Sequence, residues 1–140
     1  MRWNNLGIAL LDQFQYAEAV QAFTEVIKLR PLYVEGYTNV GLTEISWEKY
    51  GSARTAIHRA LSLDPNSARA LYYDGLLQRR AGNTEQEIAD FRKVVKMFPQ
   101  SRDARRELGI TYYQQHNNVA ALEQFHDGRK KCTRTYGKVT

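Results

Sequence analysis

Residues 3–31 read WNNLGIALLDQFQYAEAVQAFTEVIKLRP, and the same pattern returns every 34 residues along the 140-residue chain. The interval is kept by four glycines and three prolines, which are Gly7, Gly41, Gly75 and Gly109, and Pro31, Pro65 and Pro99. Self-similarity at a fixed period of this size is typical of proteins in which similar structural units stack on one another. The sequence therefore predicts a repeat protein with four units.

Each unit contains two segments with the spacing of amphipathic helices. In the first unit, apolar residues recur at helical spacing, at Leu6, Leu10 and Phe14 and then at Ala19, Phe23 and Val26. Each proline ends a second helix, because it has no N–H to donate and its ring obstructs the preceding turn. We predict helices over residues 2–14, 17–29, 34–47, 51–62, 67–80, 84–97, 102–115 and 118–130, and no strands.

The identities of the repeated residues point to a known family. The first unit supplies Trp3, Leu6-Gly7, Ala19, Phe23 and Pro31, with Leu10 at the position between Gly7 and Ala19. This resembles the tetratricopeptide repeat (TPR), whose pattern is Trp, Leu-Gly, Tyr, Ala, Phe and Pro, with only the Tyr replaced. The resemblance implies an all-α fold, a right-handed superhelical α-solenoid of antiparallel helix pairs.

The resemblance extends over residues 1–131, with repeats at approximately 1–33, 34–67, 68–101 and 102–131. The fourth repeat has Thr133 where a proline is expected. Residues 132–140 form a polar C-terminal tail that is too short to cap the array, so we expect a piece of a longer protein or an array whose ends meet something else. Near-consensus units of this kind often stand beside another domain in bacterial proteins, which the resemblance implies and the residues do not show.

In this family the first helix of each unit lines the concave face, so the resemblance also implies which residues form a ligand groove. By register these are Asn4, Asn5, Ile8, Thr38, Asn39, Leu42, Arg69, Tyr72, Tyr73, Leu76, Arg79, Arg80, Arg106, Ile110 and Tyr113. Amides can hydrogen-bond an extended backbone, aromatic rings give rigid contact area, and arginine binds carboxylates. We expect a scaffold that binds a peptide or protein segment, although polar residues line any solvated groove.

One ligand class is not expected. Family members that hold the C-terminal carboxylate of chaperones use Lys and Asn on the first unit, Asn on the second, and Lys and Arg on the third. At those positions this chain has Asn4 and Ile8, then Asn39, then Arg69 and Tyr73. Only Asn39 and Arg69 fit, so we predict that chaperone tails are not the ligand.

The net charge of +5 leaves other partners open. Residues 1–70 carry seven basic and seven acidic side chains, whereas residues 71–140 carry thirteen and eight. Such asymmetry suits an acidic protein partner, nucleic acid or an acidic membrane surface. Nucleic-acid binding by the Arg-rich second half is an alternative function, although the RNA-reading relatives of this architecture use a different repeat signature.

Self-association is a further alternative. Each unit buries its apolar face against a neighbour, so the two terminal units are expected to stay partly exposed. Trp3, Leu6 and Leu10 form one apolar stripe on the first helix, and Phe125 lies on the last. Large exposed apolar patches tend to be covered by a partner, so like ends could pair in a closed homodimer or unlike ends could stack into an open chain, and of the two we favour the homodimer.

Four polar residues occupy positions that are apolar or aromatic in other units. They are Glu44, Asp74, Gln78 and Glu87. An unpaired buried carboxylate is costly, so each acid must find a partner, reach solvent or shift its pKa. Either the middle of the array holds a perturbed acidic site, or Glu44 and Glu87 extend to water while Asp74 meets a partner such as His58.

Nothing in the sequence predicts catalysis, a cofactor or a metal site. His58, His116 and His126 lack the spacing of metal ligands with the single cysteine, Cys132, and no glycine loop suits a phosphate. No run approaches the roughly 18 apolar residues of a membrane span. A lone cysteine and a patterned start at Trp3 favour the cytoplasm.

Overall fold

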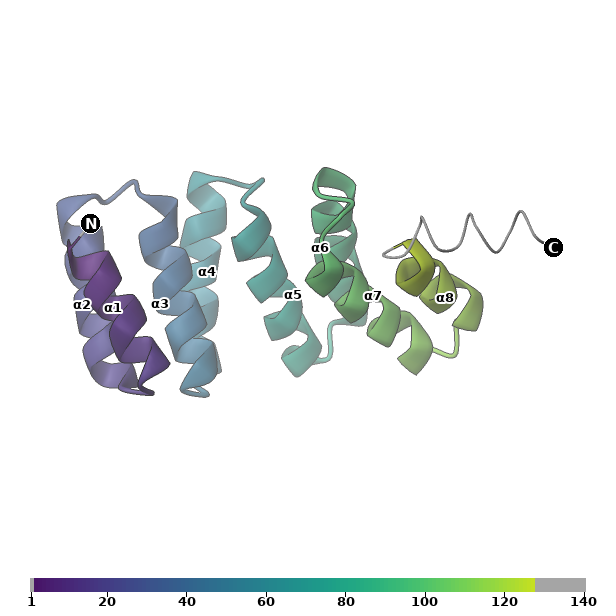
Figure 1. Ribbon diagram of the computed structural model, residues 1–140, viewed down its shortest axis with the longest axis horizontal. Coiled ribbons are helices and arrows are strands. Elements are labelled where there is room, and N and C mark those ends of the chain that lie inside the picture. The colour runs from purple at the N-terminus through teal and green to yellow at the C-terminus, as the bar shows by residue number, and fades with distance from the viewer. Residues whose placement is uncertain (1, 128–140) are drawn as a thin grey trace. The chain divides into compact units, whose positions relative to one another are not determined.

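The computed structural model describes residues 2–127, which form eight α-helices joined by short turns, with no strand in this range (Figure 1). The helices are α1 (Arg2–Asp12), α2 (Tyr16–Leu29), α3 (Val34–Ser46), α4 (Tyr50–Leu63), α5 (Ala68–Ala81), α6 (Thr84–Met97), α7 (Arg102–Gln114) and α8 (Asn118–Asp127). The predicted all-α fold is confirmed. The predicted tail 132–140, Cys132, Thr133 and the predicted end of the last helix at residue 130 lie outside the described residues.

The chain divides into two compact units, which we call unit 1 (Met1–Leu77) and unit 2 (Gln78–Thr140). Their boundary falls inside α5 and therefore within the third predicted repeat, not at a repeat edge. Most predicted helix ends are correct to within one residue. The exception is α1, which ends at Asp12 and not at residue 14.

The early end of α1 has a specific hydrogen-bonded cause. Phe14 adopts a left-handed conformation (φ 60°), its N–H donates to the carbonyl of Leu11, and the N–H of Gln15 donates to the carbonyl of Leu10. This pair of bonds is a Schellman motif, which satisfies carbonyls that the helix end leaves without a partner. The prediction that Phe14 continues the apolar stripe of α1 is therefore wrong, and its side chain is 75% exposed.

The same turn returns at the period of the sequence. The left-handed residues are Phe14, Glu48, Gly82 and His116, each 34 positions after the last, with φ of 60°, 62°, 80° and 61°. Equivalent pairs of backbone hydrogen bonds close all four turns. Only Gly82 adopts this conformation without a steric penalty, since a left-handed backbone costs a residue with a Cβ about 1–2 kcal/mol.

The core of unit 1 lies between helices that pack in chain order, α1 on α2, α2 on α3 and α3 on α4 (Figure 1). One cluster contains Ala19, Phe23 and Val40, and a second contains Ala53, Ile57 and Leu77. Most of these side chains are less than 5% exposed, so they supply the apolar burial that drives folding. In unit 2, α7 packs against both α6 and α8 around Phe91, Leu108 and Ala121.

The periodic glycines allow the two helices of a pair to approach closely. A Cβ built on Gly41 would lie 2.4 Å from Cδ1 of Ile57, and one on Gly7 would lie 2.5 Å from Cε1 of Phe23. Gly109 meets Phe125 in the same way at 2.7 Å. These distances are far below van der Waals contact, so the first helix can pack on the second only where its backbone carries no side chain.

Replacing Gly41 with alanine should therefore destabilise the protein. Because Ile57 is fully buried, it can move away only if its neighbours shift, and overpacking a core typically costs about 1–3 kcal/mol. The matched control is Gly51→Ala, because Gly51 lies in α4 with nothing within 4 Å of a Cβ. That variant should be neutral or more stable by up to about 1 kcal/mol. Urea unfolding followed by circular dichroism measures both, and equal stabilities for the two variants would contradict the packing argument.

Candidate ligand-binding surfaces

The first helices of the first three repeats, α1, α3 and α5, are joined by a chain of polar contacts. Asn39 Nδ2 on α3 donates to Asn4 Oδ1 on α1 at 2.9 Å, and Arg69 Nη2 on α5 donates to Asn39 Oδ1 at 3.0 Å. Arg69 Nη1 also pairs with Glu35. The Arg69 guanidinium lies 5.9 Å from the ring of Tyr73. These five side chains form what we call the polar row, and the contacts hold their donors and acceptors in fixed positions.

The positive and negative charges of the polar row, on Arg69 and Glu35, balance each other. Burial tends to lower the pKa of Arg69, but hydrogen bonding to Tyr73 and the charge of Glu35 outweigh it, so the pKa is raised. Arg69 remains a cation, and Glu35 supplies the matching carboxylate. The row thus offers hydrogen-bond donors and acceptors with little net charge, because its single cation is paired.

An apolar row follows the polar row along the same helices. Ile8 lies one turn after Asn4 on α1, Leu42 lies three residues after Asn39 on α3, and Leu76 holds the equivalent place after Tyr73 on α5. Residues three or four apart share a helix face. Ile8 is 43% exposed, and Leu42 and Leu76 are half-buried. We call these three residues the apolar row.

The structure qualifies several other predicted groove residues. Asn5 is exposed and Tyr72 is half-buried against the ring of Tyr73. Thr38 is fully buried and its hydroxyl donates to the carbonyl of Val34, so the prediction that it lines a groove is wrong. A β-branched hydroxyl that bonds its own helix needs no solvent or ligand partner.

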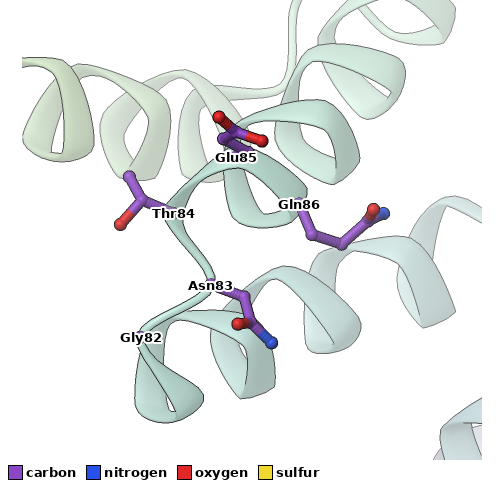
Figure 2. Close-up of a pocket in the computed structure, with 5 residues that line it drawn as sticks. All are labelled: Gly82, Asn83, Thr84, Glu85 and Gln86. Atoms are coloured by element: carbon purple, nitrogen blue, oxygen red, sulfur yellow. The ribbon is translucent and has the colours of Figure 1, made fainter.

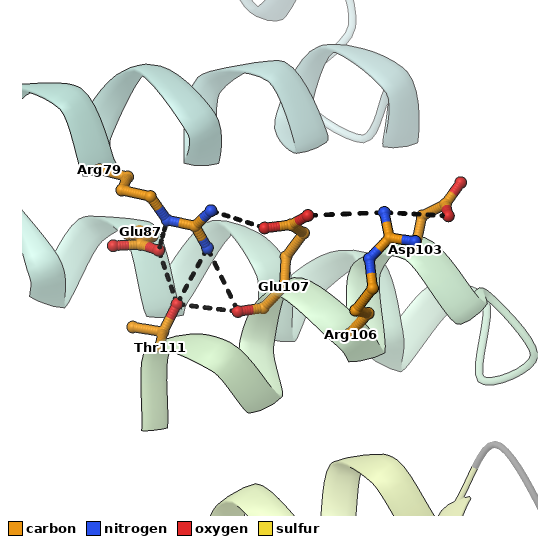
Figure 3. A network of polar contacts seen from close by, with 6 residues as sticks. All are labelled: Arg79, Glu87, Asp103, Arg106, Glu107 and Thr111. Atoms are coloured by element: carbon orange, nitrogen blue, oxygen red, sulfur yellow. Dashed lines mark hydrogen bonds and ion pairs between the residues drawn. The ribbon is translucent and has the colours of Figure 1, made fainter. Parts of the chain in front are cut away.

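In unit 2 the predicted groove residue Arg79 is engaged by neighbouring side chains (Figure 3). Its Nε donates to Glu87 Oε1 at 2.7 Å, and its Nη1 donates to Glu107 Oε2 at 2.6 Å. Nη2 donates to the hydroxyl of Thr111 at 3.3 Å, and that hydroxyl donates to Glu87 at 2.6 Å. Burial tends to lower the pKa of Arg79, but the hydrogen bonds and charges of Glu107 and Glu87 outweigh it and the pKa is raised.

This network corrects two predictions. The charge of Arg79 is directed to two carboxylates that are 4% and 11% exposed, so it is not offered to a ligand. Glu87 does not extend to water, because it is the buried acceptor for Arg79 and Thr111. Since charged hydrogen bonds are the strong ones and a lone buried charge is costly, we assign this cluster to the stability of unit 2.

The remaining predicted residues of unit 2 lie on or near its surface. Arg106 is exposed and its Nη2 is 3.5 Å from Asp103 Oδ1 and 3.6 Å from Glu107 Oε1 (Figure 3). Arg80 and Tyr113 are exposed and Ile110 is half-buried. The predicted groove arginines Arg69, Arg79 and Arg106 are therefore paired with carboxylates, which weakens the reason to expect an acidic ligand.

The other polar core residues have local explanations. His58 Nε2 lies 3.5 Å from the buried Asp74 Oδ1, as predicted, and Gln78 Oε1 accepts from Asn83 at 2.9 Å. Glu44 is 8% exposed, so the prediction that it extends to water is wrong. Burial raises the pKa of the Glu44 carboxyl, against the opposing effects of a hydrogen bond from Ser52 and the charge of Lys49.

A hollow beside the α5–α6 turn was not anticipated from the sequence (Figure 2). It has a volume of about 510 Å³ and is lined by Gly82, Asn83, Thr84, Glu85 and Gln86. These are consecutive residues of one turn, and none of the five carries an aliphatic or aromatic side chain. Small-molecule sites combine apolar walls with convergent polar groups, which this hollow does not provide.

The charge excess lies at one end of the sequence. Residues 1–127 contain 15 basic and 15 acidic side chains, whereas residues 128–140 contain five basic side chains and no acid. The described repeats therefore carry no net charge. Within residues 2–127 no group of three or more His, Cys, Asp or Glu side chains is placed to hold a metal ion, and no helix is long and apolar enough to cross a membrane.

Comparison with known proteins agrees with this architecture. The tetratricopeptide repeat family matches residues 2–33, 48–102 and 75–128, which together are more than half of the chain. The chain belongs to the tetratricopeptide repeat family, a class of α-helical protein-interaction scaffolds.

Particular relatives cover different parts of the chain. Human FK506-binding protein-like is 38% identical over 72 residues, which are 51% of this chain and 21% of that protein. The crystal structure of MamA has a TM-score of 0.81 at 21% identity, covering 96% of this chain and 79% of that one. The first TPR of Spaghetti (RPAP3), bound to the HSP90 peptide SRMEEVD, has a TM-score of 0.76 at 19% identity, covering 81% and 90%. The matched segment of this chain spans about a fifth of human FK506-binding protein-like. The MamA and RPAP3 structures have the same fold as this chain.

Replacing Arg79 with methionine should destabilise unit 2 by roughly 3 kcal/mol, because it leaves two largely buried carboxylates without their shared cation. Arg106→Met is the matched control. It removes an arginine that is 58% exposed and should cost less than about 1 kcal/mol. Thermal unfolding followed by circular dichroism compares them, and a mild effect of Arg79→Met would show that water satisfies the carboxylates.

Glu44 predicts a pH dependence of stability. Because the folded state raises the pKa of this carboxyl above its ordinary value of 4.5, the folded state binds its proton more tightly than the unfolded state does. The contribution of Glu44 to stability therefore falls as the pH rises from about that value through the raised pKa. Glu44→Gln should leave the melting temperature nearly unchanged at pH 4 and raise it at pH 7. A variant that melts lower than the parent at pH 7 would contradict this assignment.

Proposed function

We propose that this chain is a non-catalytic interaction module that binds an extended peptide or protein segment across helices α1, α3 and α5. The proposal rests on one observation, which is that the polar row and the apolar row both lie on α1, α3 and α5. The polar row supplies hydrogen-bonding groups held by their contacts with one another. The apolar row, one helical turn away, supplies Ile8, Leu42 and Leu76.

Both rows suit a polypeptide in extended conformation. Such a segment exposes backbone N–H and C=O groups along its length, and its alternate side chains point to opposite sides. The Asn39 amide is only 5% exposed and holds Asn4 and Arg69 in place, whereas the exposed Arg69 guanidinium has five N–H groups in all. Backbone groups can bond these donors while a side chain of the segment covers Ile8. The family relationship and a structural neighbour solved with a bound peptide support this reading.

The chemistry of the partner follows from the charges. Because Glu35 pairs with Arg69, the rows favour a neutral segment with apolar side chains over a strongly acidic one. Homodimerisation remains a second proposal, since Trp3 and Leu6 on α1 are 39% and 44% exposed. Nucleic-acid binding is less favoured by the described residues, because their basic and acidic side chains are equal in number.

Selection of peptides from a random phage-displayed library on the immobilised chain tests the proposal. Peptides that bind should lose at least about tenfold in affinity for Ile8→Glu, which places a charge in the apolar row. Gln21→Glu, which introduces the same charge at an exposed position of α2, should leave the affinity unchanged. Fluorescence anisotropy with the selected peptides gives the affinities. Peptides that bind both variants equally well would place the binding surface elsewhere.

A further inference from the structure

A cavity of about 430 Å³ lies where α6, α7 and α8 of unit 2 meet, and none of the helices that carry the two rows contributes to it. Its lining consists of Arg92, Lys93, Val95 and Lys96 of α6, Leu108 of α7 and Gln124 of α8. The three cationic side chains are exposed, Val95 is half-buried and Leu108 is buried. The cavity therefore combines cations that reach solvent with apolar side chains beside them, and we call it the basic cavity.

The polar side chains of the basic cavity offer hydrogen-bond donors. Arginine carries five N–H groups and lysine three, and neither side chain has an acceptor. Gln124 Oε1 already accepts from Nη1 of the buried Arg105 at 3.3 Å, which leaves the N–H groups of its amide. None of the six lining residues that the structure describes is an acid. Such a lining suits an anion that accepts several hydrogen bonds at once.

The equivalent positions of the first repeat carry matched charges. Glu25 and Lys28 of α2 precede Lys93 and Lys96 of α6 by two periods of the repeat, and Lys28 Nζ donates to Glu25 Oε1 at 3.0 Å. In α6 a lysine replaces that glutamate. Lys93 has a further contact within the chain, whereas among residues 2–127 neither Arg92 nor Lys96 makes an ion pair. The repeat itself therefore does not require these cations, and the charges of Arg92 and Lys96 are left for a ligand.

The segment around the basic cavity is also basic. Residues 91–102 contain four basic side chains and no acidic one, whereas residues 1–127 contain 15 of each. Neither Asp90, which is 4% exposed, nor Glu123, which is exposed on α8, lines the cavity. The cavity therefore lies at a local excess of positive charge in repeats that are otherwise balanced.

We propose that the basic cavity binds an acidic segment of a partner protein, with a carboxylate side chain held between Arg92 and Lys96. These two residues are four apart on α6 and therefore share a helix face. The planar guanidinium binds a carboxylate through two parallel hydrogen bonds, and the ammonium adds a second charged donor. The methylene groups of a glutamate side chain can cover Val95, so the apolar part of the lining favours a protein side chain over a small inorganic ion.

Two other occupants fit these charges less well. Residues 128–140 of this chain contain five basic side chains and no acidic one, so they have no acidic side chain to offer a basic cavity. A nucleic acid needs cations that follow successive phosphates, whereas Arg92 and Lys96 lie only about 6 Å apart along α6. A short acidic segment needs no more than these two cations and the amide of Gln124.

The probe is a fluorescein-labelled peptide of about ten residues, with glutamate and alanine alternating and the C-terminus amidated, titrated against the full chain. We expect a Kd of about 10⁻⁴ M by anisotropy at about 50 mM salt, and at least about tenfold weaker binding when glutamine replaces every glutamate. The double variant Arg92→Glu, Lys96→Glu should also bind the acidic peptide at least about tenfold more weakly. Its melting temperature should stay within about 2 °C of the parent, because both side chains are exposed and make no ion pair among residues 2–127.

The matched control is the double variant Arg30→Glu, Arg54→Glu, which makes the same change in net charge at exposed positions of unit 1 and should leave the Kd unchanged. Lys93→Glu recreates on α6 the matched pair of the first repeat and should weaken binding. Ile8→Glu should leave this Kd unchanged, so failure of this proposal and failure of the binding rows are distinguishable.

Four outcomes would overturn the proposal. They are no detectable binding of the acidic peptide, equal binding of the glutamine peptide, and tighter binding of an oligothymidylate of about ten nucleotides than of the acidic peptide. The fourth is undiminished binding by the variant Arg92→Glu, Lys96→Glu, which would assign the peptide to the basic residues 128–140.

Discussion

The fold depends on one steric constraint, the close approach of two helices at a residue without a side chain. Gly7, Gly41 and Gly109 each face a large apolar side chain of the following helix at a distance that no Cβ could occupy. The contact therefore sets how closely the two helices approach in the α1–α2, α3–α4 and α7–α8 pairs. The apolar faces of neighbouring pairs can then meet, and the cores of both units follow from that.

In unit 2 a buried charged residue replaces an apolar one, and its hydrogen-bonding groups still find partners. Glu87 occupies a position that is alanine in the other repeats, and it is buried. Its charge is matched by Arg79, which also binds Glu107, while Thr111 supplies a hydroxyl (Figure 3). Such clusters require every member, since the loss of one leaves another charge buried. Arg79 therefore acts within the fold of unit 2.

The helix faces and the turns of this protein are held by different interactions. The polar row lies on regular helices, and hydrogen bonds between repeats hold its side chains. The turns between the two helices of each repeat are closed by Schellman motifs, in which Phe14, Glu48, Gly82 and His116 take the left-handed position.

The sequence by itself determined the repeat, the number and order of the helices, and the family, because a period of 34 residues and the glycine contacts are local and recur. It also anticipated the contact between His58 and Asp74. Only the tertiary structure decided that Thr38 is buried, that Glu35, Glu87 and Glu107 engage arginines, and that Phe14 lies in a turn. Those outcomes depend on which polar side chains from distant positions meet, and on a left-handed backbone that the apolar periodicity of α1 does not reveal.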